Sequence, residues 1–209
     1  MKEMQISYLS NFGLIQDKVP TKLFSNIKKE ISQFKSNNYT EMISGLSGNN
    51  IPKHYWMRNN IKEWKQYILN LSGEYEKHFK YLKGKTFLNK SVACTADTPW
   101  FNFQQKYEFI PVHNHEGIYS YVLWIKIPYD IDKECVGKNA YASCFELFYT
   151  SITGDLKNYK IKVSKNDEGT VTLFPAYLSH CVYPFSSVNG VRISMSGNIF
   201  LNSQGATCN

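Results

Sequence analysis

Histidines are scarce in this sequence, and two of the five lie one residue apart. His113 and His115 belong to the stretch FIPVHNHEGIYSY, which spans residues 109–121. If this stretch is a β-strand, side chains two positions apart point to the same face, so both imidazoles enter one space. A third histidine, His180, follows in the β-rich segment LFPAYLSHCVYP. Three converging imidazoles would bind iron, zinc, copper or nickel and would leave coordination positions open for catalysis.

An arginine follows His180 in a run that alternates as a strand does. Within GVRISMSGNIF, Arg192 and Ser194 fall on the same face. A buried guanidinium needs an anionic partner, and a guanidinium beside a hydroxyl group is a suitable clasp for a carboxylate. The pair Asn189-Gly190 is a strong hairpin signal. It predicts that the strand of Arg192 turns back against the strand of His180.

Two amphipathic helices are expected in the first part of the chain. Apolar residues recur every three or four positions over about residues 20–35 and again over about residues 60–79, which is the spacing of one helix face. A short strand is expected within residues 5–15, and residues 36–60, rich in Asn, Gly and Ser, predict a long loop. The two histidines of this part are His54, before the second helix, and His78, near its end, and neither is expected to bind the metal.

The chain changes character at Lys85, where helical spacing gives way to short β-rich runs separated by turn residues. Regularly spaced short strands predict a sandwich or a barrel. The fold class expected is therefore α+β, mainly β: a double-stranded β-helix, or jelly roll, braced by two N-terminal helices. We interpret residues 1–209 as a single domain, with helical support and loop in 1–84, the jelly-roll core in 85–201 and a tail in 202–209.

The amino-acid composition favours some binding partners and cellular compartments over others. The net charge is +7, but the basic residues are scattered, which favours a solvated surface over a track for nucleic acid. Five cysteines without a CxxC spacing argue against a disulfide framework or a cysteine zinc site and favour a reducing compartment. No apolar run approaches the ~18 residues of a membrane span. We therefore expect a cytoplasmic protein with no membrane partner.

These residues together resemble the iron(II)- and 2-oxoglutarate-dependent oxygenases. The resemblance rests on an H-x-H pair at 113–115, on His180 behind Phe174-Pro175, and on R-x-S at Arg192, and it covers about residues 100–200. Within that superfamily the chain is most similar to the prolyl-4-hydroxylase-like oxygenases that are common in phage genomes. A phage origin would place the protein in the host cytoplasm. The resemblance implies a jelly roll, with Fe(II), 2-oxoglutarate and O2 as cofactor and cosubstrates.

The resemblance also implies a role for each matching residue. His113, His115 and His180 would hold the iron. Arg192 would pair with the far carboxylate of 2-oxoglutarate, with Ser194 as its hydroxyl partner. The reaction implied is hydroxylation of a substrate, such as a protein side chain of the proline kind or a small molecule, with oxidative decarboxylation of 2-oxoglutarate to succinate.

The strand that follows the H-x-H pair has two alternating faces, and one of them would line the cosubstrate pocket. We assign the pocket to the face of Ser120, Val122 and Trp124, where Trp124 stands at a position that relatives often fill with tyrosine. The face of Tyr119, Tyr121 and Leu123 is the alternative assignment. Because side chains alternate along a strand, only one of these sets can face the metal.

The sequence departs from the family pattern at position 115, where His115 replaces the usual carboxylate. Three neutral imidazoles leave a bound metal with one negative charge fewer, and a softer ligand set admits metals other than iron. Glu116 is adjacent, but a neighbouring strand residue points away from the site. It would replace His115 as a ligand only if Gly117 interrupts the strand.

Two other functions stay open at this stage. A cupin-like jelly roll could bind metal or sugar through the three histidines without 2-oxoglutarate, in which case Arg192 has no duty. A non-catalytic structural or binding module, for example of a virus particle, would require no metal at all. Its basic surface could contact nucleic acid, a partner that the scattered charges do not favour.

Overall fold

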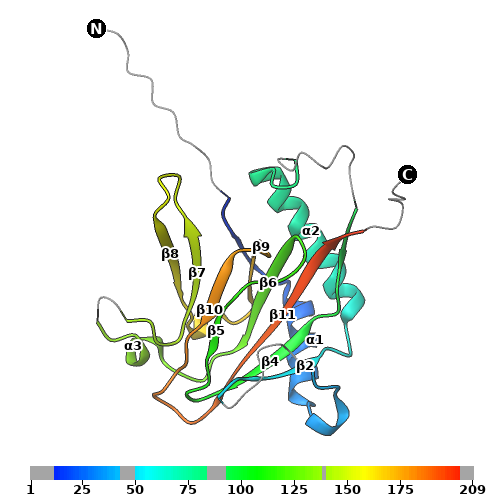
Figure 1. Cartoon of the computed structure of the whole chain (residues 1–209). Coiled ribbons are helices and arrows are strands. Elements are labelled where there is room, and N and C mark those ends of the chain that lie inside the picture. Colours follow the sequence, from blue (N-terminus) through cyan, green and yellow to red (C-terminus); the bar gives the residue numbers. More distant parts are fainter. Residues whose placement is uncertain (1–11, 43–49, 84–92, 138–139, 203–209) are drawn as a thin grey trace.

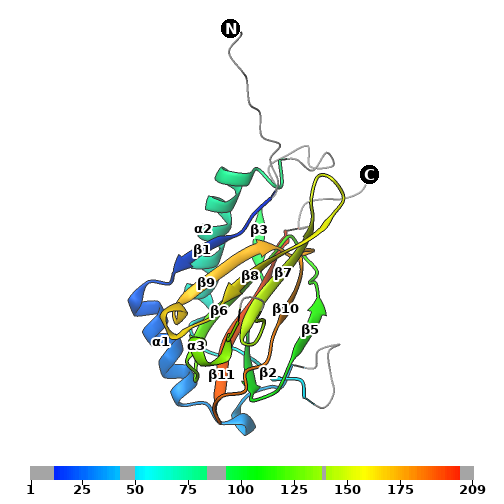
Figure 2. The same cartoon turned by 90° about the vertical axis from the view of Figure 1, so that its left-hand side faces the viewer.

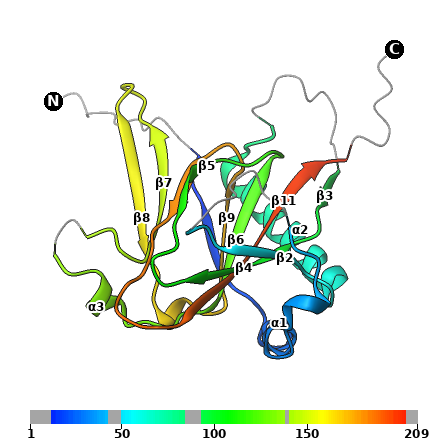
Figure 3. The same ribbon diagram turned by 60° about the horizontal axis from the view of Figure 1, so that its bottom comes forward.

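Two antiparallel β-sheets face each other, and two helices cover the outer face of the larger sheet (Figure 1, Figure 3). The computed structural model describes residues 12–42, 50–83, 93–137 and 140–202. The larger sheet has the order β1 (Ile15–Lys18), β9 (Thr170–Pro175), β6 (Tyr119–Lys126), β11 (Val191–Leu201), β4 (Trp100–Gln105) and β2 (Lys53–Trp56), with β3 (Cys94–Ala96) paired to β11. The smaller sheet has the order β5 (Ile110–His113), β10 (Ser179–Val182), β7 (Cys144–Thr150) and β8 (Leu156–Lys162).

Both expected helices are present. They are α1 (Thr21–Ser32), which begins directly after Pro20, and α2 (Ile61–Phe79). A four-residue helix, α3 (Ile131–Glu134), and two 3-10 turns, Ser36–Asn38 and Lys165–Asp167, lie in connections. Within the described part of the chain, no helix combines the length and the apolar character needed to cross a bilayer. The expected jelly roll braced by two helices is therefore confirmed.

Helix α2 is fixed to the larger sheet by aromatic packing. Its apolar stripe buries Trp64, Ile68 and Tyr75 completely against the helix-facing side of β6 and β11. Fully burying one large apolar side chain stabilises the folded state by about 1.5–3 kcal/mol. The indole of Trp64 also donates a hydrogen bond of 2.9 Å to the Tyr121 hydroxyl, which satisfies both buried polar groups.

The alternation of β6 divides the core into two layers. Tyr119 and Leu123 point to the helices, whereas Val122 and Trp124 point to the smaller sheet. There the side chains of Phe145 and others from β7, β9 and β10 complete the second core layer, between the two sheets. This arrangement aims one face of β6, and the matching face of β11, into the interior of the roll.

Two expectations about local structure were wrong. Residues 36–60 are not a continuous loop, because Lys53–Trp56 forms strand β2, which pairs with β4. Residues 43–49 of that segment lie outside the described part, as does most of the strand expected at 5–15, although β1 begins at Ile15. The turn at Asn189-Gly190 does not make a hairpin, because β10 and β11 belong to different sheets and residues 183–190 cross between them.

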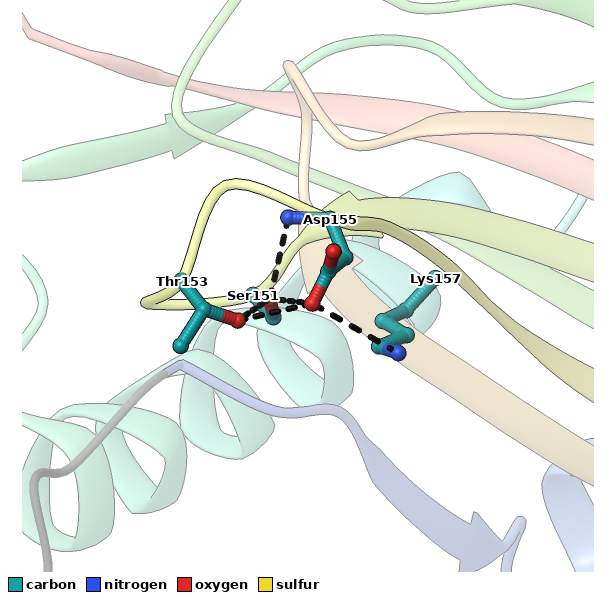
Figure 4. Close-up of polar contacts among 4 residues, drawn as sticks. All are labelled: Ser151, Thr153, Asp155 and Lys157. Atoms are coloured by element: carbon teal, nitrogen blue, oxygen red, sulfur yellow. Dashed lines mark hydrogen bonds and ion pairs between the residues drawn. The ribbon is translucent and has the colours of Figure 1, made fainter.

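The β7–β8 hairpin extends beyond the rest of the smaller sheet (Figure 2). Polar contacts close its tip, as Figure 4 shows: Thr153 Oγ1 donates to Asp155 Oδ2 at 2.7 Å, the Asp155 N–H donates to Ser151 Oγ at 3.2 Å, and Lys157 Nζ lies 3.8 Å from the same carboxylate. The tip is thus satisfied by its own side chains, and we assign it a structural role.

Two glycines should respond in opposite ways to replacement by alanine. A Cβ on Gly197 in β11 would collide with the Tyr121 hydroxyl, so Gly197→Ala is expected to lower the free energy of unfolding by about 1–3 kcal/mol. Gly73 lies inside α2 with nothing within 4 Å of an added Cβ. Gly73→Ala should therefore raise the free energy of unfolding by about 0.5–1 kcal/mol. Urea unfolding measures both. Equal effects of the two variants would contradict the packing described here.

Candidate metal centre

The three predicted histidines converge on one point. Strands β5 and β10 are antiparallel neighbours, and His113 lies directly opposite His180 in their register. The ring centroids of His113 and His180 are 4.3 Å apart. The ring centroid of His115 lies 4.9 Å from that of His113 and 5.1 Å from that of His180. One nitrogen from each ring can be chosen so that all three lie within 4.8 Å of one another. A single metal ion can therefore be reached by all three imidazoles.

Backbone carbonyls fix the tautomers of two of these rings. His113 Nδ1 lies 2.7 Å from the carbonyl oxygen of Pro111, and His180 Nδ1 lies 2.8 Å from that of Leu178. A carbonyl only accepts hydrogen bonds, so each Nδ1 carries the proton and donates. Each Nε2 then keeps its lone pair, which is the form that a metal requires.

His115 reaches the site by a route that the sequence argument did not foresee. Strand β5 ends at His113, so the two residues do not share a strand. The backbone N–H of His115 instead donates a 2.9 Å hydrogen bond to the carbonyl of Ala176, just past β9. Glu116 is exposed and does not join the histidine cluster, although the chain turns at Gly117 with a φ of +98°. His115, and not Glu116, is therefore the third residue of the cluster.

The site is lined with aromatic rings that keep its histidines neutral. Phe174 and Phe145 pack against His180 at centroid distances of 4.9 Å and 5.6 Å. Burial lowers the pKa of His115 to about 4, with a further contribution from His113. Burial also lowers the pKa of His113 and of His180, and for His180 the neighbouring His113 adds to the effect. All three rings are thus neutral at neutral pH, and each has one unprotonated nitrogen that can bind a metal.

A cavity of about 70 Å³ opens beside the histidines. Its polar wall comes from strands β2, β4 and β11 and includes a histidine that the sequence analysis missed. His54 is buried, and its Nδ1 lies 2.6 Å from Asn102 Oδ1. Asn102 Nδ2 donates in turn to Ser194 Oγ at 3.1 Å and to Ser196 Oγ at 3.0 Å. His54 lies in the four-residue run KHYW, inside the segment predicted as a loop, and no periodicity in so short a run singled it out.

Arg192 is 1% exposed, and its partners are neutral groups of the protein. Its Nε and Nη2 both donate to Gln104 Oε1, its Nη1 donates to the Tyr129 hydroxyl at 2.8 Å and to the carbonyl of Ser143 at 3.1 Å, and its Nη2 also donates to the carbonyl of Tyr183 at 2.6 Å. Within the described residues no ion pair includes Arg192. The guanidinium therefore has no carboxylate partner there.

The other residues predicted to bind the cosubstrate differ in whether they line the cavity. Ser120 and Ser194 line the cavity, and Ser120 Oγ donates to the carbonyl of Gly197 at 3.3 Å. Trp124 and Arg192 do not line it. The Trp124 ring lies 5.8 Å from the guanidinium carbon, and its buried Nε1 has no hydrogen-bond partner. The structure thus brings the three histidines, Ser120 and Ser194 to one cavity. Trp124 and Arg192 are not part of its lining.

Comparison with known families agrees with the resemblance seen in the sequence. Residues 98–198 match the family model described as "Putative 2OG-Fe(II) oxygenase". A sequence search of curated proteins gave no match. The matched residues contain all three histidines and the R-x-S triplet, so the resemblance to the iron(II)- and 2-oxoglutarate-dependent oxygenases is confirmed.

Solved structures extend this likeness to the helices. A prolyl-4-hydroxylase from Pseudomonas putida superposes with a TM-score of 0.57 and 12% identity, covering 91% of this chain and 94% of its own. The non-heme alpha-ketoglutarate-dependent carbocyclase SnoK of nogalamycin biosynthesis gives 0.60 and 8%, covering 92% and 80%. A prolyl hydroxylase from Trichoplax adhaerens gives 0.55 and 12%, covering 93% and 88%. At these identities the likeness shows a shared fold.

Removal of one ligand should abolish tight metal binding. His180→Ala is expected to weaken Fe(II) binding at least ~100-fold, because one of the three nitrogen ligands is lost. Anaerobic calorimetry measures the affinity. His78→Ala is the matched control, because His78 is an exposed histidine on α2. Equal Fe(II) affinity in the two variants would refute the metal centre.

The metal-free protein should lose stability in mild acid. The pKa of His115 falls from its ordinary 6.5 to about 4 on folding, so between these values the unfolded chain binds a proton that the folded chain does not. The free energy of unfolding should therefore decrease as the pH falls through this window, by up to about 1.4 kcal/mol per pH unit for each such histidine. Urea unfolding at pH 7 and pH 5 measures the change. The difference should shrink in His115→Asn, and an unchanged difference would contradict the assignment.

Proposed function

We propose that this chain, which shares its fold and its family match with the 2OG-Fe(II) oxygenases, is an iron(II)- and 2-oxoglutarate-dependent dioxygenase that hydroxylates its substrate. The proposal rests on one observation: three imidazoles from two distant segments of the chain meet beside a cavity, and two of them are held in the metal-binding tautomer. Imidazole rings that backbone carbonyls orient in this way serve metal coordination better than they serve packing. The donor set therefore fits Fe(II).

The protein residues would divide the work between holding the metal and excluding water. His113, His115 and His180 would present three nitrogen ligands and leave positions open for 2-oxoglutarate and O2. Bound iron with these cosubstrates would supply the oxidising power, with 2-oxoglutarate decarboxylated to succinate. Phe145 and Phe174 would keep bulk water from the reacting atoms.

The cosubstrate would lie in the cavity beside the triad. Ser120 and Ser194 stand in its wall, while Arg192 and Trp124, which the family pattern also favours, stand one layer behind. The substrate would enter the same cavity. Because two of the similar structures are of prolyl hydroxylases, a peptidyl proline is the first substrate class to test, and a small molecule is the second. We do not favour nucleic acid as a partner.

A second function is supported by the ligand set itself. Three histidines without a carboxylate, and an Arg192 whose partners all belong to the protein, would also suit a metal-binding jelly roll that does not use 2-oxoglutarate. The two functions differ in whether 2-oxoglutarate binds to the metal-loaded protein. The experiment below separates them directly.

Addition of 2-oxoglutarate to the anaerobic Fe(II)-loaded protein should produce a weak visible charge-transfer band, because the cosubstrate would chelate a metal with open positions. His180→Ala should abolish the band, and His78→Ala should preserve it. Absorption spectroscopy with confirmed metal loading makes the measurement, and succinate release in the presence of O2 and prolyl peptides follows it. A flat spectrum from the loaded, unmutated protein would reject the dioxygenase in favour of the second function.

A further inference from the structure

Two buried thiols are in contact beside the first strand of the β7–β8 hairpin. Cys135 directly follows α3, Cys144 begins β7, and their Sγ atoms are 3.8 Å apart. The S–S bond of a disulfide is ~2.05 Å long, so the two sulfurs would need to approach each other by about 1.8 Å to form one. Cys94 and Cys181, also within the described part of the chain, have no such thiol neighbour. Cys135 and Cys144 are therefore the cysteine pair that the fold brings together.

The hydrogen bonds that hold these two thiols are weak. Cys135 Sγ donates to the carbonyl of Ala140 at 3.4 Å, and Cys144 Sγ donates to the carbonyl of Ala142 at 3.5 Å. A thiol is a poor donor, so rotation about either Cα–Cβ bond loses little hydrogen-bond energy. The sulfurs can therefore approach each other without the loss of a strong contact.

Burial favours a neutral disulfide over a charged thiolate at this position. Burial and the neighbouring Cys135 together raise the pKa of the Cys144 thiol to about 12. A disulfide carries neither a charge nor a titratable proton, so burial does not disfavour it in this way. Because the thiolate is the reactive form, the same burial makes oxidation slow at neutral pH. Cys135 is 8% exposed and Cys144 is 0% exposed, so a small oxidant reaches the Cys135 sulfur first.

Cys144 lies between two residues that contact functional candidates. Ser143, the residue before it, has a φ of +66° and offers its carbonyl to Arg192 Nη1 at 3.1 Å. Phe145, the residue after it, packs against His180 at a centroid distance of 5.6 Å. A covalent bond at Cys144 would therefore restrain the backbone at the point where β7 enters the core between the two sheets.

From this geometry we infer that Cys135 and Cys144 form an oxidation site, in which hydrogen peroxide converts the two thiols into a disulfide that locks the end of α3 to the start of β7. The Cys135 thiolate first attacks one oxygen of the peroxide, so that an S–O bond forms, the O–O bond breaks, and hydroxide leaves and takes up a proton to become water. The Cys144 sulfur then attacks the Cys135 sulfur. The S–S bond forms, the S–O bond breaks, and the second water leaves with the Cys144 proton.

The two thiols together lose two electrons and two protons, and the peroxide is reduced to two molecules of water. An excess of a small thiol such as dithiothreitol reverses the change by thiol–disulfide exchange. The site does not require the proposed metal chemistry, so the metal-free protein is sufficient to test it.

Peptide mapping of the full chain tests the site. The metal-free, unmutated protein is treated with hydrogen peroxide, its remaining thiols are blocked with iodoacetamide under denaturing conditions, and it is digested with trypsin without reduction. Trypsin cuts after Lys133 and Lys138, so Cys135 and Cys144 fall on separate peptides, ECVGK and the peptide that begins at Asn139. Mass spectrometry should find these two peptides joined, with a mass two hydrogens below their sum, and dithiothreitol should separate them.

The joined peptide should be the main product that contains Cys135, whereas Cys94 and Cys181 should be recovered alkylated. Recovery of Cys135 and Cys144 as separate alkylated peptides after prolonged treatment would overturn the inference. A sulfinic acid at Cys135, or a link from either residue to another cysteine as the main product, would overturn it as well. The same treatment of the urea-unfolded chain, whose thiols are exposed, shows that the oxidant is active.

The disulfide should also stabilise the fold, because it restricts the unfolded chain between residues 135 and 144. The midpoint of thermal unfolding of the metal-free protein should rise by roughly 5 °C on oxidation and return on reduction. Cys144→Ser should lose this rise, and Cys94→Ser, the matched control that keeps both contacting thiols, should retain it. An unchanged or lower midpoint in a sample that mapping shows to be fully linked would contradict the lock.

Discussion

The pairing of β5 with β10 is the constraint on which the candidate metal centre depends. It sets His113 opposite His180, and a shift of one residue in either strand would turn one imidazole to the far side of the smaller sheet. The register is held from the other side as well, because β10 also pairs with β7, where His180 lies opposite Leu147. The core between the sheets thus fixes the ligand geometry before any metal binds. The site is preorganised by the fold.

The same burial that holds the rings also sets their chemistry. Phe145 and Phe174 belong to the core between the sheets and touch His180, so the residues that stabilise the roll also lower the pKa values of the ligands. A neutral, oriented imidazole binds metal without first losing a proton. The absence of a carboxylate from the cluster would act on a bound metal, which would keep more of its positive charge and attract anionic ligands more strongly.

The periodicity of apolar residues predicted the helices and strands whose pattern lies in consecutive residues. It missed the features that depend on contacts with residues distant in the sequence. The spacing of Trp64 and Ile68 gave α2, and the alternation of β6 placed Val122 and Trp124 toward the smaller sheet. Strand β2 was missed because four residues carry little pattern, and it exists as a strand through its pairing with β4. The predicted hairpin at Asn189-Gly190 was wrong because β10 and β11 belong to different sheets. The packing of the core decides which sheet a strand joins, and no local sequence signal reports it.

Arg192 shows why the role of a charged residue is harder to predict than its burial. Its alternation with Ile193 correctly placed it inside the roll, and a buried guanidinium does require compensation. The sequence cannot distinguish a ligand carboxylate from a set of neutral oxygens, because these come from four separate segments, at Gln104, Tyr129, Ser143 and Tyr183. These oxygens accept hydrogen bonds from all five N–H groups of the guanidinium and compensate its burial. The role of Arg192 toward a ligand carboxylate therefore stays a prediction.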